Sequence, residues 1–166
     1  MPAPKTFTER SRIMKLLDSL EMKTPGFAGD VSIVLAAGHG KRIKSNLSKM
    51  LHPIWGQPTV LRVINAARKG LADPTLIVTV GIKAEQVAST IGRRENLMYA
   101  YQESPNGTGH AVKVAVKKIP AQYKGLVFIF AGDMGLLKDS VVRRFREYFK
   151  NSAADMCCEV PEPLEE

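Results

Sequence analysis

At 166 residues, with 45% hydrophobic and 24% charged side chains, the chain has an ordinary globular composition and enough length for one well-packed domain. It has no apolar run near the roughly 18 residues of a membrane span, and its first thirty residues lack the apolar core of a secretory signal, so we expect a cytoplasmic protein. The net charge of +8 raises a nucleic-acid hypothesis, but the cations lie near one glycine-rich turn or scattered along helices, with few aromatic residues between them. An anionic small molecule explains this distribution equally well and is the preferred interpretation.

The first predicted element is a helix over residues 6–22 that stands apart from the rest of the chain. Thr6 and Glu9 have capping-box spacing, and apolar residues recur at helical intervals. Residues 24–30 are rich in Pro and Gly and read as a linker. We therefore divide the chain into an N-terminal extension, 1–29, and a main domain, 30–166, and expect the apolar stripe to pack on that domain or on a partner. The stripe consists of Ile13, Leu16, Leu17 and Leu20.

The main domain opens with a short apolar run that ends in a glycine-rich, cationic turn. Residues 31–35 suit one buried strand of a parallel sheet, and the turn that follows reads AAGHG. Small residues allow close approach of the backbone, and cations suit a polyanion, so a phosphate-bearing ligand is expected at the end of this strand. Gly38 and Gly40 complete neither a dinucleotide fingerprint nor a phosphate loop, so on spacing alone an unrelated α/β turn stays an alternative. The cations are Lys41, Arg42, Lys44 and Lys49.

Helices and strands alternate through the rest of the chain, which predicts an α/β fold: a Rossmann-like, mainly parallel sheet with helices on both faces. Pro58 suits the first turn of a helix that runs to Gly70. The adjacent Cys157 and Cys158 form neither a disulfide framework nor a zinc site and are expected to be buried thiols. Strands are predicted at 75–80, 97–101, 126–130 and 155–160, and helices at 84–91, 110–119 (with Val112, Ala115, Val116 and Ile119 on one side) and 140–149.

Three loops should meet at the carboxyl edge of such a sheet, where open α/β sheets bind ligands: 36–49, 102–109 and 131–137. Asp133, directly after a strand, is either a ligand for Mg²⁺ or a cap of the following helix. Arg42 and Lys49 could neutralise a phosphoryl group, while Gln102 and Thr108 could read a base edge or make ordinary loop hydrogen bonds.

Four segments together resemble one family. Residues 35–42 read LAAGHGKR, residues 48–52 read SKMLH, residues 102–111 read QESPNGTGHA and residues 126–137 read LVFIFAGDMGLL. This set resembles the uridylyltransferase half of the bacterial bifunctional enzymes that make UDP-N-acetylglucosamine, within the sugar-phosphate nucleotidyltransferases. The first motif occurs throughout that superfamily, whereas the second and third are characteristic of the N-acetylglucosamine 1-phosphate branch.

The resemblance implies a role for each matched residue, with UTP and a sugar 1-phosphate as substrates and Mg²⁺ as cofactor. Arg42 and Lys49 would meet the triphosphate and act in catalysis with Asp133, which would hold the metal. His52 and His110 are expected to be structural. The nucleotide-binding residues would be Leu35, Ala36, Ala37, Gly38, Gly40, Lys49, Gln102, Gly107 and Thr108, of which Gln102, Gly107 and Thr108 would recognise uracil.

The sequence also departs from the family pattern. Lys41, Ile43 and Ser48 replace the usual residues, and Gly135 replaces a proline, which is expected to loosen the turn beside Asp133. The resemblance covers about residues 31–158, so the sugar-binding half and the β-helical acetyltransferase domain lack counterparts and we expect a fragment. The alternatives are a non-catalytic nucleotide-binding module, with the N-terminal helix recruiting a partner, and a nucleotidyltransferase for another nucleotide or sugar. The sequence leaves homo-oligomerisation open.

Overall fold

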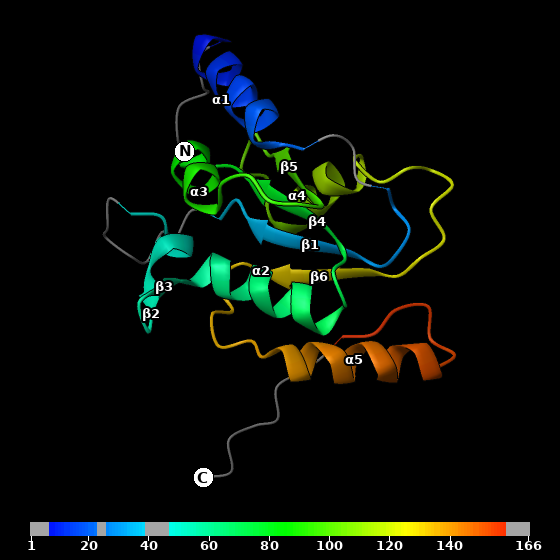
Figure 1. The fold of residues 1–166 in the computed structure, drawn as a ribbon. Coiled ribbons are helices and arrows are strands. Elements are labelled where there is room, and N and C mark those ends of the chain that lie inside the picture. Colours follow the sequence, from blue (N-terminus) through cyan, green and yellow to red (C-terminus); the bar gives the residue numbers. More distant parts are fainter. Residues whose placement is uncertain (1–6, 23–25, 39–46, 159–166) are drawn as a thin grey trace.

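A single parallel sheet of four strands organises the computed structural model, which describes residues 7–22, 26–38 and 47–158 (Figure 1). The strands are β1 (Val31–Ala36), β4 (Thr75–Val80), β5 (Leu97–Tyr101) and β6 (Val127–Ala131), in the spatial order β5-β4-β1-β6. All three neighbouring pairs are parallel. The order places β1 at the centre, because the chain first builds β4 and β5 on one side of it and then β6 on the other.

Helices cover both faces of the sheet, which confirms the predicted α/β architecture. The larger apolar cluster packs α1 (Phe7–Leu20), α2 (Thr59–Gly70), α3 (Ala84–Ile91) and α5 (Asp139–Asn151) against one face. The other face carries α4 (Thr108–Val116) over β5, β4 and β1. A 3₁₀ turn, η1 (Lys49–Leu51), and a small hairpin of β2 (Pro53–Ile54) and β3 (Gln57–Pro58) lead into α2. No described helix has the length and apolar character needed to cross a membrane.

The apolar stripe of α1 packs on the main domain. Ile13 and Leu17 are buried against the cluster that includes α3 and β5, while Leu16 and Leu20 are half-buried. Just beyond the helix, a Glu21 carboxylate oxygen accepts a hydrogen bond from the Tyr99 backbone amide of β5 at 2.7 Å. The domain behind the stripe therefore covers it, and the predicted cap residue Thr6 lies outside the described residues.

Helix α4 differs from its prediction in both position and buried face. It begins at Thr108 and ends at Val116, whereas the predicted helix covered 110–119. Ala111 and Ala115, one turn apart, are its buried residues, and Val116 is exposed rather than on the packed side. Small side chains at this spacing let a helix lie close to a sheet, so the alanines mark the contact better than the valines do.

The predicted strand at 155–160 was wrong where it can be examined. Residues 155–158 form no strand, and Cys157 is half-buried while Cys158 is exposed, so neither is a buried thiol. An apolar run forms a strand only where a neighbouring strand can accept its backbone hydrogen bonds, and among the described strands β6 pairs with β1 alone. Residues 159 and 160 lie outside the described part.

The sheet is not covered completely. Ile33, Ile77 and Ile129 lie side by side in register, and the first two are fully buried whereas Ile129 is 49% exposed. Helix α4 packs mainly on β5, β4 and β1. Helices thus lie on both faces of the sheet, and among the described residues one face of β6 is partly exposed.

Candidate functional site

Two glycines allow the carboxyl ends of the strands to lie against one another. A Cβ atom on Gly132, after β6, would lie 2.9 Å from the Leu35 carbonyl oxygen, and the Gly132 amide donates to that same oxygen at 2.9 Å. A Cβ atom on Gly81, after β4, would lie 2.9 Å from the Ala37 Cβ and 3.1 Å from the Gln102 carbonyl oxygen. The backbone from Leu35 to Gly38 is therefore flanked directly by the segments that follow its two neighbouring strands.

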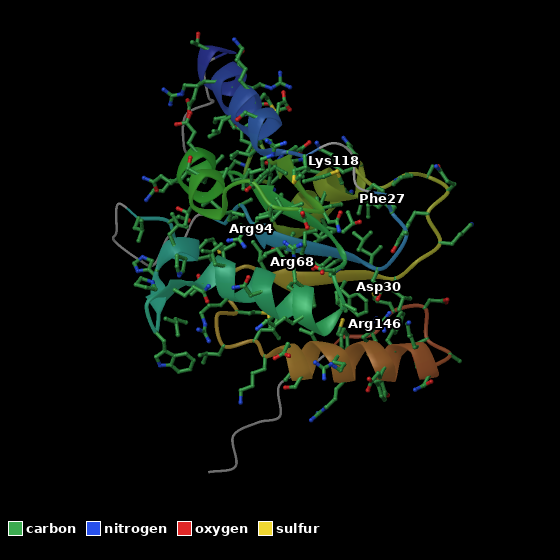
Figure 2. All side chains as sticks on the ribbon, in the orientation of Figure 1. Phe27, Asp30, Arg68, Arg94, Lys118 and Arg146 are labelled. Carbon is green, nitrogen blue, oxygen red and sulfur yellow. The ribbon has the colours of Figure 1, made fainter. Side chains whose placement is uncertain are left out.

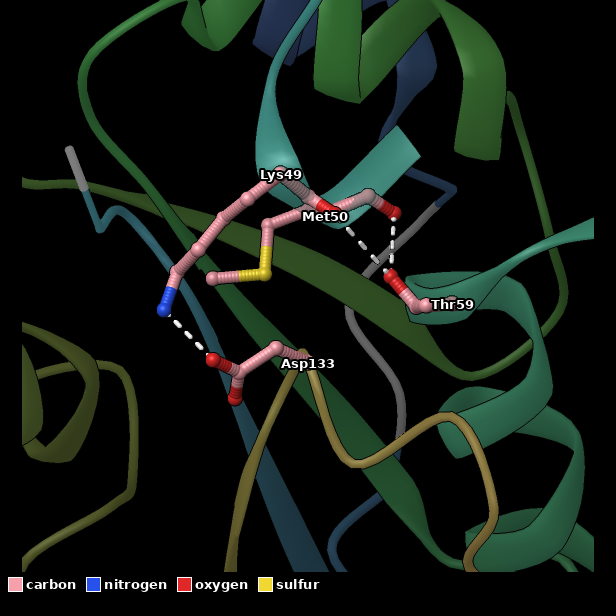
Figure 3. A network of polar contacts seen from close by, with 4 residues as sticks. All are labelled: Lys49, Met50, Thr59 and Asp133. Atoms are coloured by element: carbon pink, nitrogen blue, oxygen red, sulfur yellow. Dashed lines mark hydrogen bonds and ion pairs between the residues drawn. The ribbon is translucent and has the colours of Figure 1, made fainter. Parts of the chain in front are cut away.

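An ion pair joins two of the predicted site residues across this edge. Lys49 Nζ lies 2.5 Å from Asp133 Oδ2, and both side chains are partly exposed (Figure 3). Lys49 comes from η1, after β1, and Asp133 comes from the turn after β6. The chain order reverses between β1 and β6, and this switch point is where open α/β sheets bind ligands.

The glycine at position 38 lies close to the Lys49 side chain. A Cβ atom on Gly38 would lie 3.2 Å from Lys49 Cε, tighter than ordinary van der Waals contact. The lysine stem thus passes over the end of the Gly38 backbone on its way to Asp133. This arrangement puts a cation, a carboxylate and exposed backbone in one place.

Asp133 does not cap the following helix, because the residue at the N-terminal boundary of α5 is Lys138. Its carboxylate is 40% exposed, so a ligand can reach it from solvent. Carboxylate oxygen is the donor type that Mg²⁺ prefers, and Mg²⁺ usually binds one or two carboxylates together with phosphate oxygens and water. The donor type and accessibility of Asp133 fit such an ion.

The residues expected at the base lie at the other end of the same edge, after β5. Gln102 is buried, and its Nε2 lies 3.0 Å from the Gly107 carbonyl oxygen and 3.1 Å from His110 Nδ1. Gly107 has φ +87° and precedes α4, which begins with the exposed Thr108. His110 therefore contacts Gln102 directly, and its structural role stays a prediction.

The two ends of the edge are chemically different. Strands lie about 4.8 Å apart, so the ends of β5 and β6, three strand spacings apart, are separated by roughly 14 Å. The β5 end carries the uncharged side chains of Gln102, which is buried and hydrogen-bonded within the protein, and of Thr108, which is exposed; the β6 end carries the partly exposed Lys49 and Asp133. An extended ligand with a neutral hydrogen-bonding end and an anionic end matches this layout. Gly40 and Arg42, with Lys41 and Lys44, lie outside the described residues.

Two residues that support the Lys49–Asp133 pair were not predicted from the sequence. Thr59 is buried at the start of α2, and its hydroxyl donates to the Met50 carbonyl oxygen at 2.9 Å. Arg62, one turn further along α2, donates from Nε to the Gly135 carbonyl oxygen at 2.5 Å and lies over the Trp55 ring. Their sequence context signals only the start of an amphipathic helix, and no motif marks them. Gly81 could have been noticed, since it follows a buried strand directly.

The turn at Gly135 is held firmly, contrary to the expectation that glycine would loosen it. Its amide donates to the Asp133 carbonyl oxygen at 2.9 Å, and its own carbonyl accepts from Arg62. A Cβ atom at this position would lie 2.7 Å from Ile54 Cδ1 and 2.8 Å from Thr59 Cγ2. These two side chains occupy the space that any larger residue at 135 would need.

A separate cavity of about 690 Å³ lies at the opposite, amino edge of the sheet, where Figure 2 labels Phe27, Asp30 and Arg146. Arg146 of α5 forms an ion pair with the buried Asp30 just before β1. Lys150, in the last turn of α5, also lines the cavity. Cations at a helix C-terminus compensate its dipole, so the charge here has a structural explanation.

The fold and the site define a nucleotidyltransferase domain. The chain belongs to the family of the MobA-like NTP transferase domain, whose profile matches residues 32–163. The bifunctional protein GlmU of Caldicellulosiruptor saccharolyticus is 38% identical over 125 residues, which cover 75% of this chain and 27% of that protein. GlmU of Clostridium beijerinckii is 43% identical over 136 residues, which cover 80% of this chain and 29% of that protein. The chain thus spans about a quarter of the length of these relatives.

Solved structures share the fold at lower sequence identity. The structure of Rv0371c from Mycobacterium tuberculosis in complex with manganese matches with a TM-score of 0.59 and 20% identity, over 74% of this chain and 60% of that one. CMP:2-keto-3-deoxy-manno-octonic acid synthetase complexed with CTP matches with a TM-score of 0.56 and 16% identity, over 76% and 49%. Both comparisons show that the fold is shared.

Proposed function

We propose that the chain supplies the UTP-binding half of an enzyme that forms UDP-N-acetylglucosamine from UTP and N-acetylglucosamine 1-phosphate. The observation that carries the proposal is the Lys49–Asp133 pair, set at the switch point of the sheet within the K-x-L-H and G-D segments. The similarity of 36–44% to GlmU proteins supports the same branch of the family. We further propose that residues 1–29 form an extension and that residues 30–166 form the nucleotide-binding part.

In this proposal the nucleotide lies along the carboxyl edge. The backbone of residues 35–38 runs beside it, Gln102, Gly107 and Thr108 recognise uracil, and Lys49 with Arg42 neutralises the triphosphate. Asp133 holds Mg²⁺, which when bound offsets negative charge on the phosphate oxygens.

The reaction needs no covalent protein intermediate. A phosphate oxygen of the sugar 1-phosphate attacks the α-phosphorus of UTP in line, a new P–O bond forms, and the bond to the bridging oxygen breaks to release pyrophosphate. The protein contributes positioning and charge neutralisation, as in phosphoryl transfer generally. Lys49 provides both, since its ammonium group is held at a fixed place beside the carboxylate.

A second candidate is a nucleotide-binding module without turnover. The chain covers about a quarter of its curated relatives and 49–60% of the similar solved chains. Nucleotide binding without pyrophosphate release on addition of N-acetylglucosamine 1-phosphate would favour this candidate over the enzyme. A preference for another nucleotide would indicate a nucleotidyltransferase of different specificity.

The test is calorimetric titration with UTP, CTP, GTP and ATP, each with and without Mg²⁺. We expect selective binding of UTP that Mg²⁺ strengthens, and loss of the Mg²⁺ effect in Asp133→Asn. Asp155→Asn, which neutralises an exposed carboxylate far along the chain from the site, is the matched control and should bind like the wild type. An unchanged Mg²⁺ effect in Asp133→Asn would remove Asp133 from the metal site, and failure to bind any of the four nucleotides would overturn the proposal.

A further inference from the structure

Thr59 connects the two sides of the Lys49–Asp133 pair. It is the first residue of α2 and is buried, and its side chain has a hydroxyl and a methyl branch that contact different segments (Figure 3). The hydroxyl faces η1, which carries Lys49. The methyl group faces the turn that carries Asp133.

The hydroxyl side fixes a segment that has little internal support. Thr59 Oγ1 lies 2.9 Å from the Met50 carbonyl oxygen and 3.4 Å from that of Lys49, and the Thr59 amide donates to the His52 carbonyl oxygen at 3.1 Å. Element η1 has three residues, and its own bonds are Leu51 N to Ser48 O at 2.9 Å and a longer one at 3.4 Å. The hydrogen bonds from Thr59 therefore hold the backbone of this turn from outside, together with the buried side chains of Met50 and Leu51.

The methyl group of Thr59 lies against the turn that carries Asp133. A Cβ atom at Gly135 would lie 2.8 Å from Thr59 Cγ2 and 3.2 Å from Thr59 Cβ, so the backbone at Gly135 lies directly against this side chain. Gly135 is bonded through its amide to the Asp133 carbonyl oxygen. The start of α2 thus lies against both turns, with hydrogen bonds to the first and a van der Waals contact to the second.

Met50 connects η1 to the strand ends, because its side chain lies against the glycines that follow β1 and β6. It is buried, its Sδ lies 3.1 Å from the position of a Cβ on Gly132, and its Cε lies 3.5 Å from that on Gly38. Lys49, the preceding residue, moves with the same backbone. A displacement of the Met50 carbonyl therefore displaces the Lys49 stem relative to both glycines.

We propose that the Thr59 hydroxyl positions Lys49 against Asp133, so that Thr59 is a positioning residue of the nucleotide site. What the positioned pair does in the reaction rests on the proposed function, whereas the positioning itself is a property of the ligand-free protein. Thr59→Val keeps the methyl contact and the size of the side chain but removes the hydroxyl. Thr59→Ser keeps the hydroxyl and removes the methyl group.

The first measurement needs no nucleotide. It follows the ¹⁵N–¹H NMR signal of the Lys49 ammonium group, which pairing with Asp133 protects from exchange with water. Lys49→Met identifies the signal and Asp133→Asn shows its loss. Lys118, paired with Glu21 at 3.0 Å on a distant part of the molecule, provides an internal control.

We expect Thr59→Val to lose the protected Lys49 signal and keep that of Lys118, and Thr59→Ser to keep both. A Lys49 signal that persists in Thr59→Val, disappears in Thr59→Ser, or is unprotected in the wild type would overturn the proposal. Loss of both lysine signals in Thr59→Val would also overturn it, because the effect would then be general loss of structure.

The second measurement compares binding of UTP with binding of uridine. Loss of one hydrogen bond of ordinary strength corresponds to roughly a three- to ten-fold effect, so Thr59→Val should weaken UTP binding by about this factor. Uridine binding should be unchanged, and Thr59→Ser should restore UTP affinity. Equal weakening of both ligands in Thr59→Val would count against a role through Lys49. Absence of nucleotide binding by the wild type would refute the proposed function, while the NMR result would still decide the positioning.

Discussion

At the residue scale, Tyr99 makes the free energy of unfolding depend on pH in the alkaline range. Burial of its ring raises the pKa of the hydroxyl well above the ordinary value of 10.0; nearby Glu21 adds to this and Arg94 opposes it. The hydroxyl donates to the Gly92 carbonyl oxygen at 2.7 Å, just past α3. Because the unfolded tyrosine ionises first, its contribution is complete below about pH 10 and declines as pH rises further.

We therefore expect the free energy of unfolding of the wild type to fall above about pH 10 more steeply than that of Tyr99→Phe. At neutral pH the variant should be less stable by about 1 kcal/mol, because the hydrogen bond to Gly92 is lost. Urea unfolding at pH 8 and pH 11 measures both effects. A difference between the two proteins that stays constant over this range would contradict the assignment to Tyr99.

Some residues of the candidate site could be predicted from the sequence, and others could not. Lys49 and Asp133 follow strands, and the rule that parallel strand ends share an edge is enough to bring them together. Thr59 could not be predicted, because its importance depends on which two turns its branches meet after folding. The sequence predicts a looser turn at Gly135 because glycine is flexible. In the structure the absence of a side chain is what matters, since Ile54 and Thr59 fill the space that a side chain would need.

At the element scale, a continuous apolar run predicts a strand but does not tell whether both of its faces are buried. β1 and β4 are continuous apolar runs and are buried almost throughout, so their pattern and their position agree. β6 is equally apolar, yet its alternate residues are exposed in the described part of the chain, because α4 packs mainly on the other three strands. Residues 156–158 are apolar too, but pairing with a neighbouring strand is a property of the whole sheet and cannot be seen within a segment.

Helix α1 is expected to stabilise the domain through its buried side. Leu17→Ala should lower the free energy of unfolding by about 2–5 kcal/mol, because a fully buried leucine leaves a cavity. Met14→Ala on the same helix is the matched control, since Met14 is 39% exposed and should cost far less. Urea unfolding gives both values.

Hydrogen exchange of the Tyr99 amide then shows whether α1 also protects the edge of β5. That amide donates to Glu21 just beyond the helix, so Leu17→Ala should accelerate its exchange more than that of amides in β1. Equal losses of stability in the two variants would mean that α1 does not pack as described.

At the scale of the whole molecule, charge and exposed apolar surface lie in different places. The charged pair of the site lies at the carboxyl edge, and the Asp30–Arg146 pair closes the amino edge. Between these edges, the face of β6 away from α2 and α5 exposes Val127 and Ile129 at 41% and 49%. Exposed apolar side chains on an edge strand favour association with other chains.

We expect the double substitution Val127→Thr, Ile129→Thr to reduce self-association while changing the free energy of unfolding little. Threonine is as compatible with a strand as valine, and the two positions contribute little buried area because they are half exposed. Phe128→Ala, on the buried face of the same strand, should instead cost about 3–5 kcal/mol. Light scattering over a concentration series and urea unfolding provide the two measurements. If the double variant destabilises the domain as strongly as Phe128→Ala does, the open face of β6 must be covered by part of the same molecule in solution.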